Sequence, residues 1–260
     1  MIVDCHTHIN FISDEFGASA HIEAAEPVDV CIVLADEGEP SQDVNKKLSG
    51  YVSKHREKMV GFAYVNPTED NISIRGLASV TEKIGLNGVV LYCASGGFHP
   101  AHSQAMQFYE LAVERGLPVF FHNAGHLRPD AVLDYAQPYL LDEIARAFPT
   151  LKMVIGTMGV PFVEQTLSMV GKHENVYADL TIKPGSIWQV YNMVVAAHER
   201  GVMDKLLFGS GYPLGRAEQC IETLLGFNRL LGDADLPVVP RGDIQTIIER
   251  DTLALLGIKK

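Results

Sequence analysis

Cysteine is scarce in this sequence and too scattered to support a disulfide-stapled fold. The four cysteines, Cys5, Cys31, Cys93 and Cys220, are far apart and form no CxxC pair. In a chain of 260 residues this usage indicates reduced thiols. We therefore expect a cytoplasmic protein.

Long apolar runs and excess positive charge are also lacking. No run approaches the roughly 20 apolar residues that a membrane-spanning helix needs, and Asp4 and His6 come too early for a signal peptide. Lysine and arginine number 21 against 32 acidic residues, which gives a net charge of −11. That charge is a poor match to nucleic-acid phosphates or anionic lipid surfaces. We expect neither a nucleic acid nor a membrane as a partner.

Short aliphatic and β-branched runs are plentiful and recur along the whole chain. Eight of them occupy Met1–Cys5, Asp29–Ala35, Met59–Val65, Asn87–Tyr92, Leu117–His122, Leu151–Ile155, Asn175–Leu180 and Lys205–Gly209. Most are continuously apolar, as expected of parallel strands that are covered on both faces. Eight strands close a β/α barrel, and 260 residues suits one such barrel.

Helical patterns lie between these runs. Apolar residues at 105, 108, 109, 112 and 113 follow the spacing of one helix face, and the same pattern returns over 217–225. A final helix is expected near Gly242–Leu256. No linker or internal repeat interrupts the alternation. The sequence therefore predicts one (β/α)8 TIM-barrel domain over residues 1–260, with its chemistry at the carboxyl ends of the strands.

Three histidines stand where strands are expected to end. His6 and His8 follow the first run, and their spacing of two residues places both side chains on one face of a strand. His122 ends the apolar run of the fifth strand and offers a third nitrogen. Three imidazoles suffice to hold a catalytic zinc. For His6 and His8 the alternative is a hydrogen-bonded pair without a metal, and for His122 alone it is a satisfied core histidine.

Four sequence segments, in this order and spacing, resemble the amidohydrolase superfamily. They are Asp4–His8 (D-x-H-x-H), Gly61–Pro67 (G-F-A-x-V-x-P), Gly85–Leu91 (G-x-x-G-V-x-L) and Leu117–His122 (L-P-V-x-x-H). The similarity is to the amidohydrolase-related branch that includes aminocarboxymuconate-semialdehyde decarboxylase. It implies a metal-dependent hydrolase or decarboxylase on a (β/α)8 barrel, with His6, His8 and His122 as metal ligands.

Two positions depart from the pattern of that family. Thr157 stands where the sixth-strand motif has a histidine, and Gly211 stands where the eighth-strand motif has a metal-binding aspartate. The active site is therefore expected to be degenerate. Restoring an aspartate at 211 should raise metal affinity, because it adds both a ligand and a negative charge.

The fourth strand also lacks the lysine or glutamate that bridges two ions in many superfamily members. We therefore expect at most one divalent ion, zinc or another, per chain. Asp179 and His126 are the preferred candidates for the missing catalytic groups, because both follow strands at the mouth of the barrel. Asp179 could equally orient Lys183 or a histidine. Other polar residues at the mouth are weaker candidates: Asp36, Glu37, Cys93, His99 and His102.

The sequence thus favours an enzyme, a mononuclear metal-dependent hydrolase. Its expected substrate is a small polar molecule with a C–N, ester or lactone bond. A metal-independent lactonase-like enzyme and a non-catalytic member of the fold that binds a small molecule remain as alternatives. The sequence is compatible with a homo-oligomer.

Overall fold

Eight parallel strands form a nearly closed barrel in the computed structural model, which describes residues 1–13, 15–38, 40–70, 85–122, 128–231 and 236–259. The strands are β1 (Val3–Thr7), β2 (Val30–Leu34), β3 (Met59–Tyr64), β4 (Gly88–Leu91), β5 (Val119–Phe121), β6 (Met153–Ile155), β7 (Val176–Asp179) and β8 (Leu206–Leu207). Each strand pairs with the next in sequence. The predicted fold and its strands are confirmed.

Backbone hydrogen bonds join β1 to the segment that follows β8. The amide of Cys5 donates to the carbonyl of Phe208, and the amide of His8 donates to the carbonyl of Tyr212, each over 2.9 Å. Thr7 forms a parallel bridge with Tyr212 as well. These contacts bring the carboxyl end of β1 beside the loop that carries Gly211.

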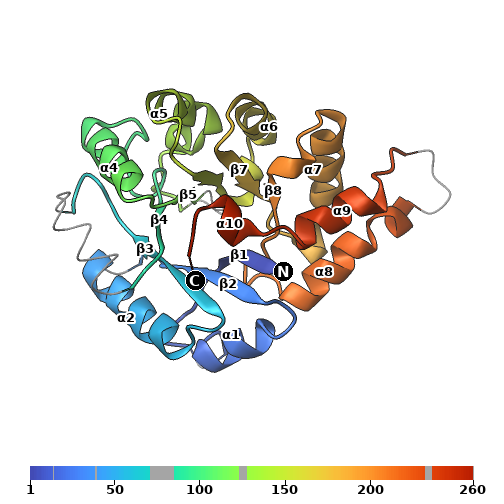
Figure 1. The fold of residues 1–260 in the computed structure, drawn as a ribbon, viewed down its shortest axis with the longest axis horizontal. Helices are drawn as coiled ribbons and strands as arrows, with labels where there is room; N and C mark the ends of the chain where they lie inside the picture. The colour runs from blue at the N-terminus through green and yellow to red at the C-terminus, as the bar shows by residue number, and fades with distance from the viewer. Residues whose placement is uncertain (14, 39, 71–84, 123–127, 232–235, 260) are drawn as a thin grey trace.

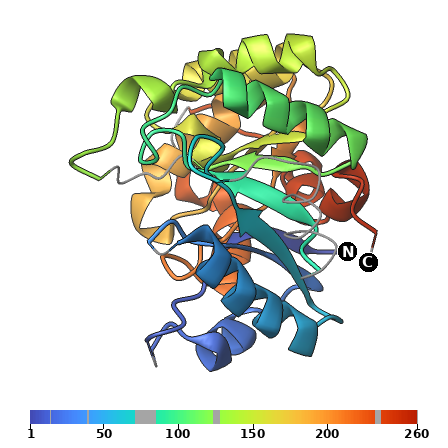
Figure 2. The ribbon, with the colours of Figure 1, turned by 90° about the vertical axis from the view of Figure 1, so that its left-hand side faces the viewer.

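Helices surround the strands (Figure 1). They are α1 (Ala18–Ala24), α2 (Ser41–Lys54), α4 (Ser103–Glu114), α5 (Asp142–Ala147), α6 (Val163–Lys172), α7 (Ile187–Glu199), α8 (Ala217–Leu225), α9 (Arg241–Ile248) and α10 (Thr252–Leu255). Both chain termini lie at one end of the barrel (Figure 2). Within the described residues, no helix is both long and apolar enough to cross a bilayer.

The predicted final helix is wrong in one respect, because two helices occupy that segment. Between α9 and α10, the guanidinium of Arg250 donates to the carbonyls of Leu206 (3.0 Å) and Met203 (3.2 Å). The side chain of Asp251 then accepts from the amide of Ala254 (3.0 Å) and caps α10. These side-chain contacts accompany the interruption of the helix between Ile248 and Thr252.

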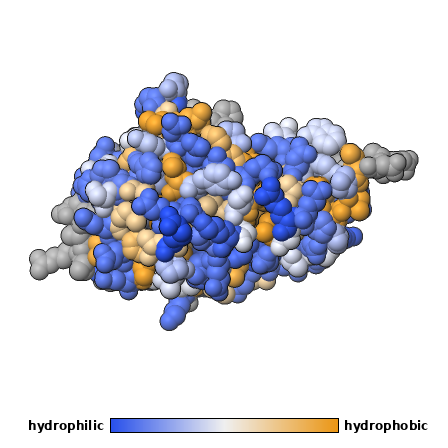
Figure 3. Space-filling model, turned by 90° about the horizontal axis from the view of Figure 1, so that it is seen from above, coloured by the Kyte–Doolittle hydropathy of each residue, from blue (hydrophilic) through white to orange (hydrophobic). Residues whose placement is uncertain are grey.

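Every residue of the eight strands is buried. All four cysteines are buried and free. The face shown in Figure 3 is mostly hydrophilic, with scattered hydrophobic areas. The large apolar core lies inside the helix layer and fixes the strand ends in space.

Helix α1 docks through a buried histidine beside the barrel mouth. His21 is 1% exposed, and its Nδ1 lies 2.8 Å from the hydroxyl of Tyr51. Its ring also contacts the ring of Tyr212 edge-on at 5.2 Å. Burial, assisted by the nearby imidazoles of His8 and His55, lowers the pKa of His21 to about 4. The imidazole of His21 is therefore neutral in the folded protein at neutral pH.

This burial predicts a loss of stability in acid. Between pH 6.5 and about 4 the unfolded chain binds a proton at His21 that the folded chain rejects, so the unfolding free energy falls as the pH falls. The loss attributable to this residue is about 3 kcal/mol over the window. Chemical denaturation of metal-free protein should show this slope flattened in His21→Gln. The control His102→Asn, which keeps a helix-capping side chain at an exposed position, should retain the slope. An unchanged slope in His21→Gln would contradict the assignment.

Candidate metal centre

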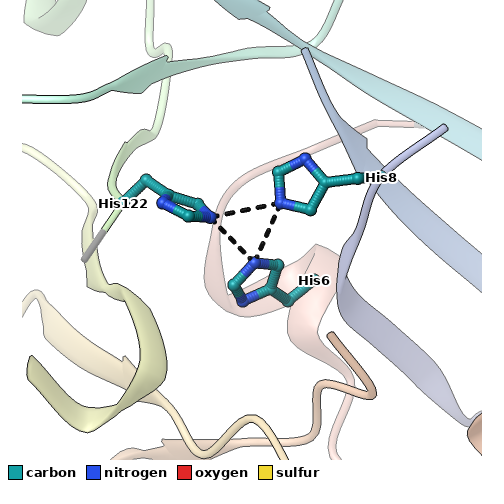
Figure 4. Close-up of side chains that lie close together, drawn as sticks. All are labelled: His6, His8 and His122. Atoms are coloured by element: carbon teal, nitrogen blue, oxygen red, sulfur yellow. Dashed lines mark hydrogen bonds between the residues drawn. The ribbon is translucent and has the colours of Figure 1, made fainter. Parts of the chain in front are cut away.

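The ends of β1 and β5 bring three imidazoles together. His6 lies in β1, His8 follows it, and His122 comes directly after β5. Their Nε2 atoms point toward one another (Figure 4) and are separated by 3.1 Å (His6 to His8) and 3.2 Å (each to His122). The rings cross at 66–79°, so each presents one nitrogen to a shared centre. The three histidines predicted from the sequence converge.

This triangle of nitrogens fits a single divalent ion. Zinc bonds imidazole at roughly 2.0–2.1 Å, and tetrahedral angles then separate two nitrogen ligands by about 3.3 Å. The observed separations of 3.1–3.2 Å are close to that value. Among the described residues this is the group of histidine, cysteine or carboxylate side chains whose donor atoms could hold a metal. Three neutral nitrogen ligands leave a fourth position for water or substrate.

The orientation of His6 is set by a buried aspartate from β7. The Nδ1 atom of His6 lies 2.5 Å from Oδ2 of Asp179 and 3.0 Å from the hydroxyl of Thr181. Asp179 is completely buried, so it contacts the histidine and does not open onto solvent. Of the two roles considered for Asp179, the geometry favours orienting a histidine over contact with substrate. Metal-binding histidines commonly have such a carboxylate on their second nitrogen.

Electrostatics keep this pair as a carboxylate and a neutral imidazole. Burial lowers the pKa of His6, and the attraction of Asp179 only partly opposes it. Burial alone would raise the pKa of Asp179, but His6 and the hydrogen bonds from Thr181 and Thr157 outweigh it and hold the pKa below its usual value. Burial and the neighbouring imidazoles also lower the pKa of His122 well below its usual value. Neutral imidazoles are the form that binds metals.

The other two histidines have different surroundings. Nδ1 of His8 lies 2.8 Å from the half-exposed carboxylate of Asp36, at an angle that does not form a hydrogen bond. Nδ1 of His122 has no hydrogen-bond partner among the described residues. The ring of His122 is instead held against the ring of Tyr92, with centroids 4.6 Å apart. Two carboxylates, Asp179 and Asp36, therefore lie one imidazole away from the metal position.

The remaining candidates from the sequence do not join this cluster. His126 lies outside the described residues. The imidazole of His102 caps α4 by accepting from the amide of Gln104, and that of His99 accepts from the amide of Ala101. The carboxylate of Glu37 accepts from the hydroxyl of Ser95 at 2.5 Å.

A catalytic thiol is disfavoured at the mouth, since burial raises the pKa of Cys93. A thiol held in its neutral form is a poor nucleophile.

Thr181 contacts the site and was not identified from the sequence. It follows Asp179 by two residues, and its hydroxyl touches both Asp179 and His6. The proximity to Asp179 was visible in the sequence, but a threonine after a strand is common in ordinary loops. Only the three-dimensional arrangement distinguishes it.

Comparison with known proteins agrees with this geometry. The sequence pattern of the amidohydrolase family matches residues 3–236. A search of curated proteins finds no match.

Similar solved structures include a probable 2-pyrone-4,6-dicarboxylic acid hydrolase from Acinetobacter baumannii with citric acid bound (TM-score 0.71, 14% identity, 99% of both chains). A 2,6-dihydroxybenzoate decarboxylase from Rhizobium is similar as well (0.70, 13%, 98% of both). So is a 5-carboxyvanillate decarboxylase from Novosphingobium aromaticivorans complexed with manganese (0.70, 11%, 99% of this chain and 96% of that one).

At these identities the structures establish the shared barrel, and the family match covers most of the sequence. The histidines at the ends of β1 and β5 lie within the matched region. This chain belongs to the amidohydrolase family.

Proposed function

We propose that this protein is a mononuclear metal-dependent hydrolase that acts on a C–N, ester or lactone bond of a small polar substrate. The observation that carries the proposal is the convergence of the three Nε2 atoms within 3.2 Å of one another. Since Nδ1 of His6 faces a carboxylate, its proton lies on that side and its Nε2 presents a lone pair to the shared centre. A divalent cation at the shared centre would accept this lone pair and, in the same tautomer, those of His8 and His122.

His6, His8 and His122 would hold the ion. A divalent ion in this position would supply Lewis-acid polarisation of a substrate carbonyl and activation of a water. Asp179 keeps His6 in the tautomer that the site needs, and Asp36 places a negative charge beside His8. These carboxylates offset charge without occupying a ligand position, in place of the family aspartate that Gly211 replaces.

Lys183 provides a positive charge at the mouth for substrate binding. It follows Asp179 by four residues, is half-buried, and forms no ion pair with any residue in the described part of the chain. Its charge adds to the effect of burial in lowering the pKa of His6 and of His122, which places it in their neighbourhood. An ammonium group without an ion-pair partner among the described residues suits a substrate with a polar or negatively charged group.

The metal-independent alternative is less well supported. Such an enzyme would use the histidines as hydrogen-bonding groups toward the substrate, yet their Nε2 atoms face one another.

Metal analysis and hydrolysis assays test the proposal together. Protein purified without chelator should contain up to one divalent ion per chain, and hydrolysis of an amide, ester and lactone panel should stop on chelation. His6→Ala, His8→Ala and His122→Ala should each lose the ion, because each removes one of three ligands. The control His198→Ala, on α7 and remote from the cluster, should keep it. A wild-type chain that binds no added zinc and hydrolyses its substrates equally well in chelator would refute the proposal.

Position 211 is not simply an empty ligand site. Gly211 has a φ of +63°, and a Cβ there would lie 2.7 Å from Cγ2 of Thr181. An aspartate tolerates left-handed backbone better than most residues, but its Cβ would press on the methyl group of a residue that contacts His6. The expected gain in metal affinity from restoring the aspartate is therefore opposed by this contact.

The structure predicts that two substitutions are needed at this position. Gly211→Asp alone should unfold more readily, by about 1–3 kcal/mol because of overpacking, and should bind zinc no better than wild type. Gly211→Asp combined with Thr181→Ser removes the obstructing methyl and should bind zinc more tightly than Thr181→Ser alone. Zinc titration of the four proteins measures this comparison. If the single variant already binds zinc more tightly than wild type, Thr181 yields easily and this account of Gly211 is wrong.

A further inference from the structure

Backbone strain in this protein is concentrated around a single carboxylate. The non-glycine residues with positive φ in the described part of the chain are Thr157 (51°), Met158 (52°) and Thr181 (38°). For a β-branched residue this conformation is a genuine outlier, and it persists only where the surroundings enforce it. In this conformation the backbone N–H of each threonine donates to Asp179. The N···O distances are 3.0 Å from Thr157 to Oδ2 and 2.9 Å from Thr181 to Oδ1.

The two threonine hydroxyls belong to the same hydrogen-bond network, and the donor in each of their hydrogen bonds can be assigned. The backbone N–H groups donate to both carboxylate oxygens, so Asp179 acts as an acceptor. The hydroxyl of Thr181 therefore donates to Asp179, and its own oxygen is left to accept from the hydroxyl of Thr157, 3.2 Å away. The Nδ1 atom of His6 also faces Asp179 and must carry the proton.

A glycine in the segment after β8 leaves room for this carboxylate. A Cβ at Gly209 would collide with Oδ1 of Asp179 and would lie 3.0 Å from Cβ of His6. The location of Asp179 is thus enclosed by the loops after β6, β7 and β8. Three segments that are distant in sequence fix one side chain.

We propose that Thr157 and Thr181 are positioning residues of the metal centre, which clamp Asp179 so that His6 keeps its proton on Nδ1 and its lone pair on Nε2. Thr157, where the family pattern has a histidine, thus supports His6 through Asp179 and does not act on the substrate. The inference rests on the proposed function, since its consequence is tighter metal binding. Outer partners of metal-binding histidines typically contribute roughly 10- to 100-fold to metal affinity.

Hydroxyl deletions test the clamp. Thr181→Val removes the hydroxyl but keeps the β-branched shape and hence the backbone strain, whereas Thr181→Ser keeps the hydroxyl. Thr157→Val removes only the outer hydroxyl and retains the backbone N–H that faces Asp179. Thr166→Val is the matched control, because Thr166 is fully buried and its hydroxyl has no hydrogen-bond partner among the described residues. For each protein, zinc affinity is measured by competition with a chromophoric chelator, and the melting temperature is measured in chelator.

The zinc dissociation constant should rise roughly 10- to 100-fold in Thr181→Val, less in Thr157→Val, and not at all in Thr166→Val. Thr181→Ser should recover most of the affinity. Gly209→Ala, which keeps both hydroxyls but displaces Asp179, should weaken binding as Thr181→Val does. Affinity in Thr181→Val equal to wild type, or an equal loss in Thr166→Val, would overturn the inference.

The tautomer of His6 gives a readout that does not require metal. Nitrogen-15 NMR of metal-free wild type should show His6 protonated on Nδ1, and Thr181→Val should shift the population toward the other tautomer. An unchanged tautomer would overturn the clamp. If wild type binds no zinc, the proposed function fails, and this NMR comparison still decides the inference about Thr157 and Thr181.

Discussion

The hydrogen bond between Nδ1 of His6 and the Asp179 carboxylate is the interaction on which the rest of the site depends. It joins β1 to β7 across the interior, although 173 residues separate the two in sequence. Because Asp179 is fully buried, an unpaired charge there would be costly, and the imidazole N–H with the threonine donors satisfies it. The same bond decides which nitrogen of His6 is available to an ion. Core stability and metal chemistry thus share one contact.

The placement of negative charge follows from this arrangement. An aspartate that binds the ion directly both neutralises it and occupies a ligand position. Here Asp179 and Asp36 lie on the far sides of His6 and His8, where they would offset the charge of a bound ion without taking a ligand position. Gly211, in a left-handed conformation against Thr181, has become part of the packing behind the site. The negative charge at this site therefore lies on the carboxylates that contact the histidines, and not on a residue at position 211.

Much of the barrel and of the three-histidine cluster could be predicted from the sequence. Continuous apolar runs identify buried parallel strands, and polar residues that end such runs identify the mouth, so His6, His8 and His122 followed from position alone. The role of Asp179 could not be chosen in this way, because a strand end does not say which neighbouring element the side chain meets. Thr181 and the clamp on Asp179 depend on positive φ values at residues that do not favour them, and no local pattern signals this. The break between α9 and α10 was missed because Arg250 bonds to carbonyl groups from another part of the chain.

The most direct test of the account is X-ray absorption spectroscopy of the protein loaded with one equivalent of zinc. It measures the number and type of ligand atoms around the ion. We expect three imidazole nitrogens and one oxygen ligand at about 2.0 Å, and no zinc–zinc scattering. A first shell with fewer than three imidazoles, or a second zinc nearby, would contradict the convergence of His6, His8 and His122 on a single ion.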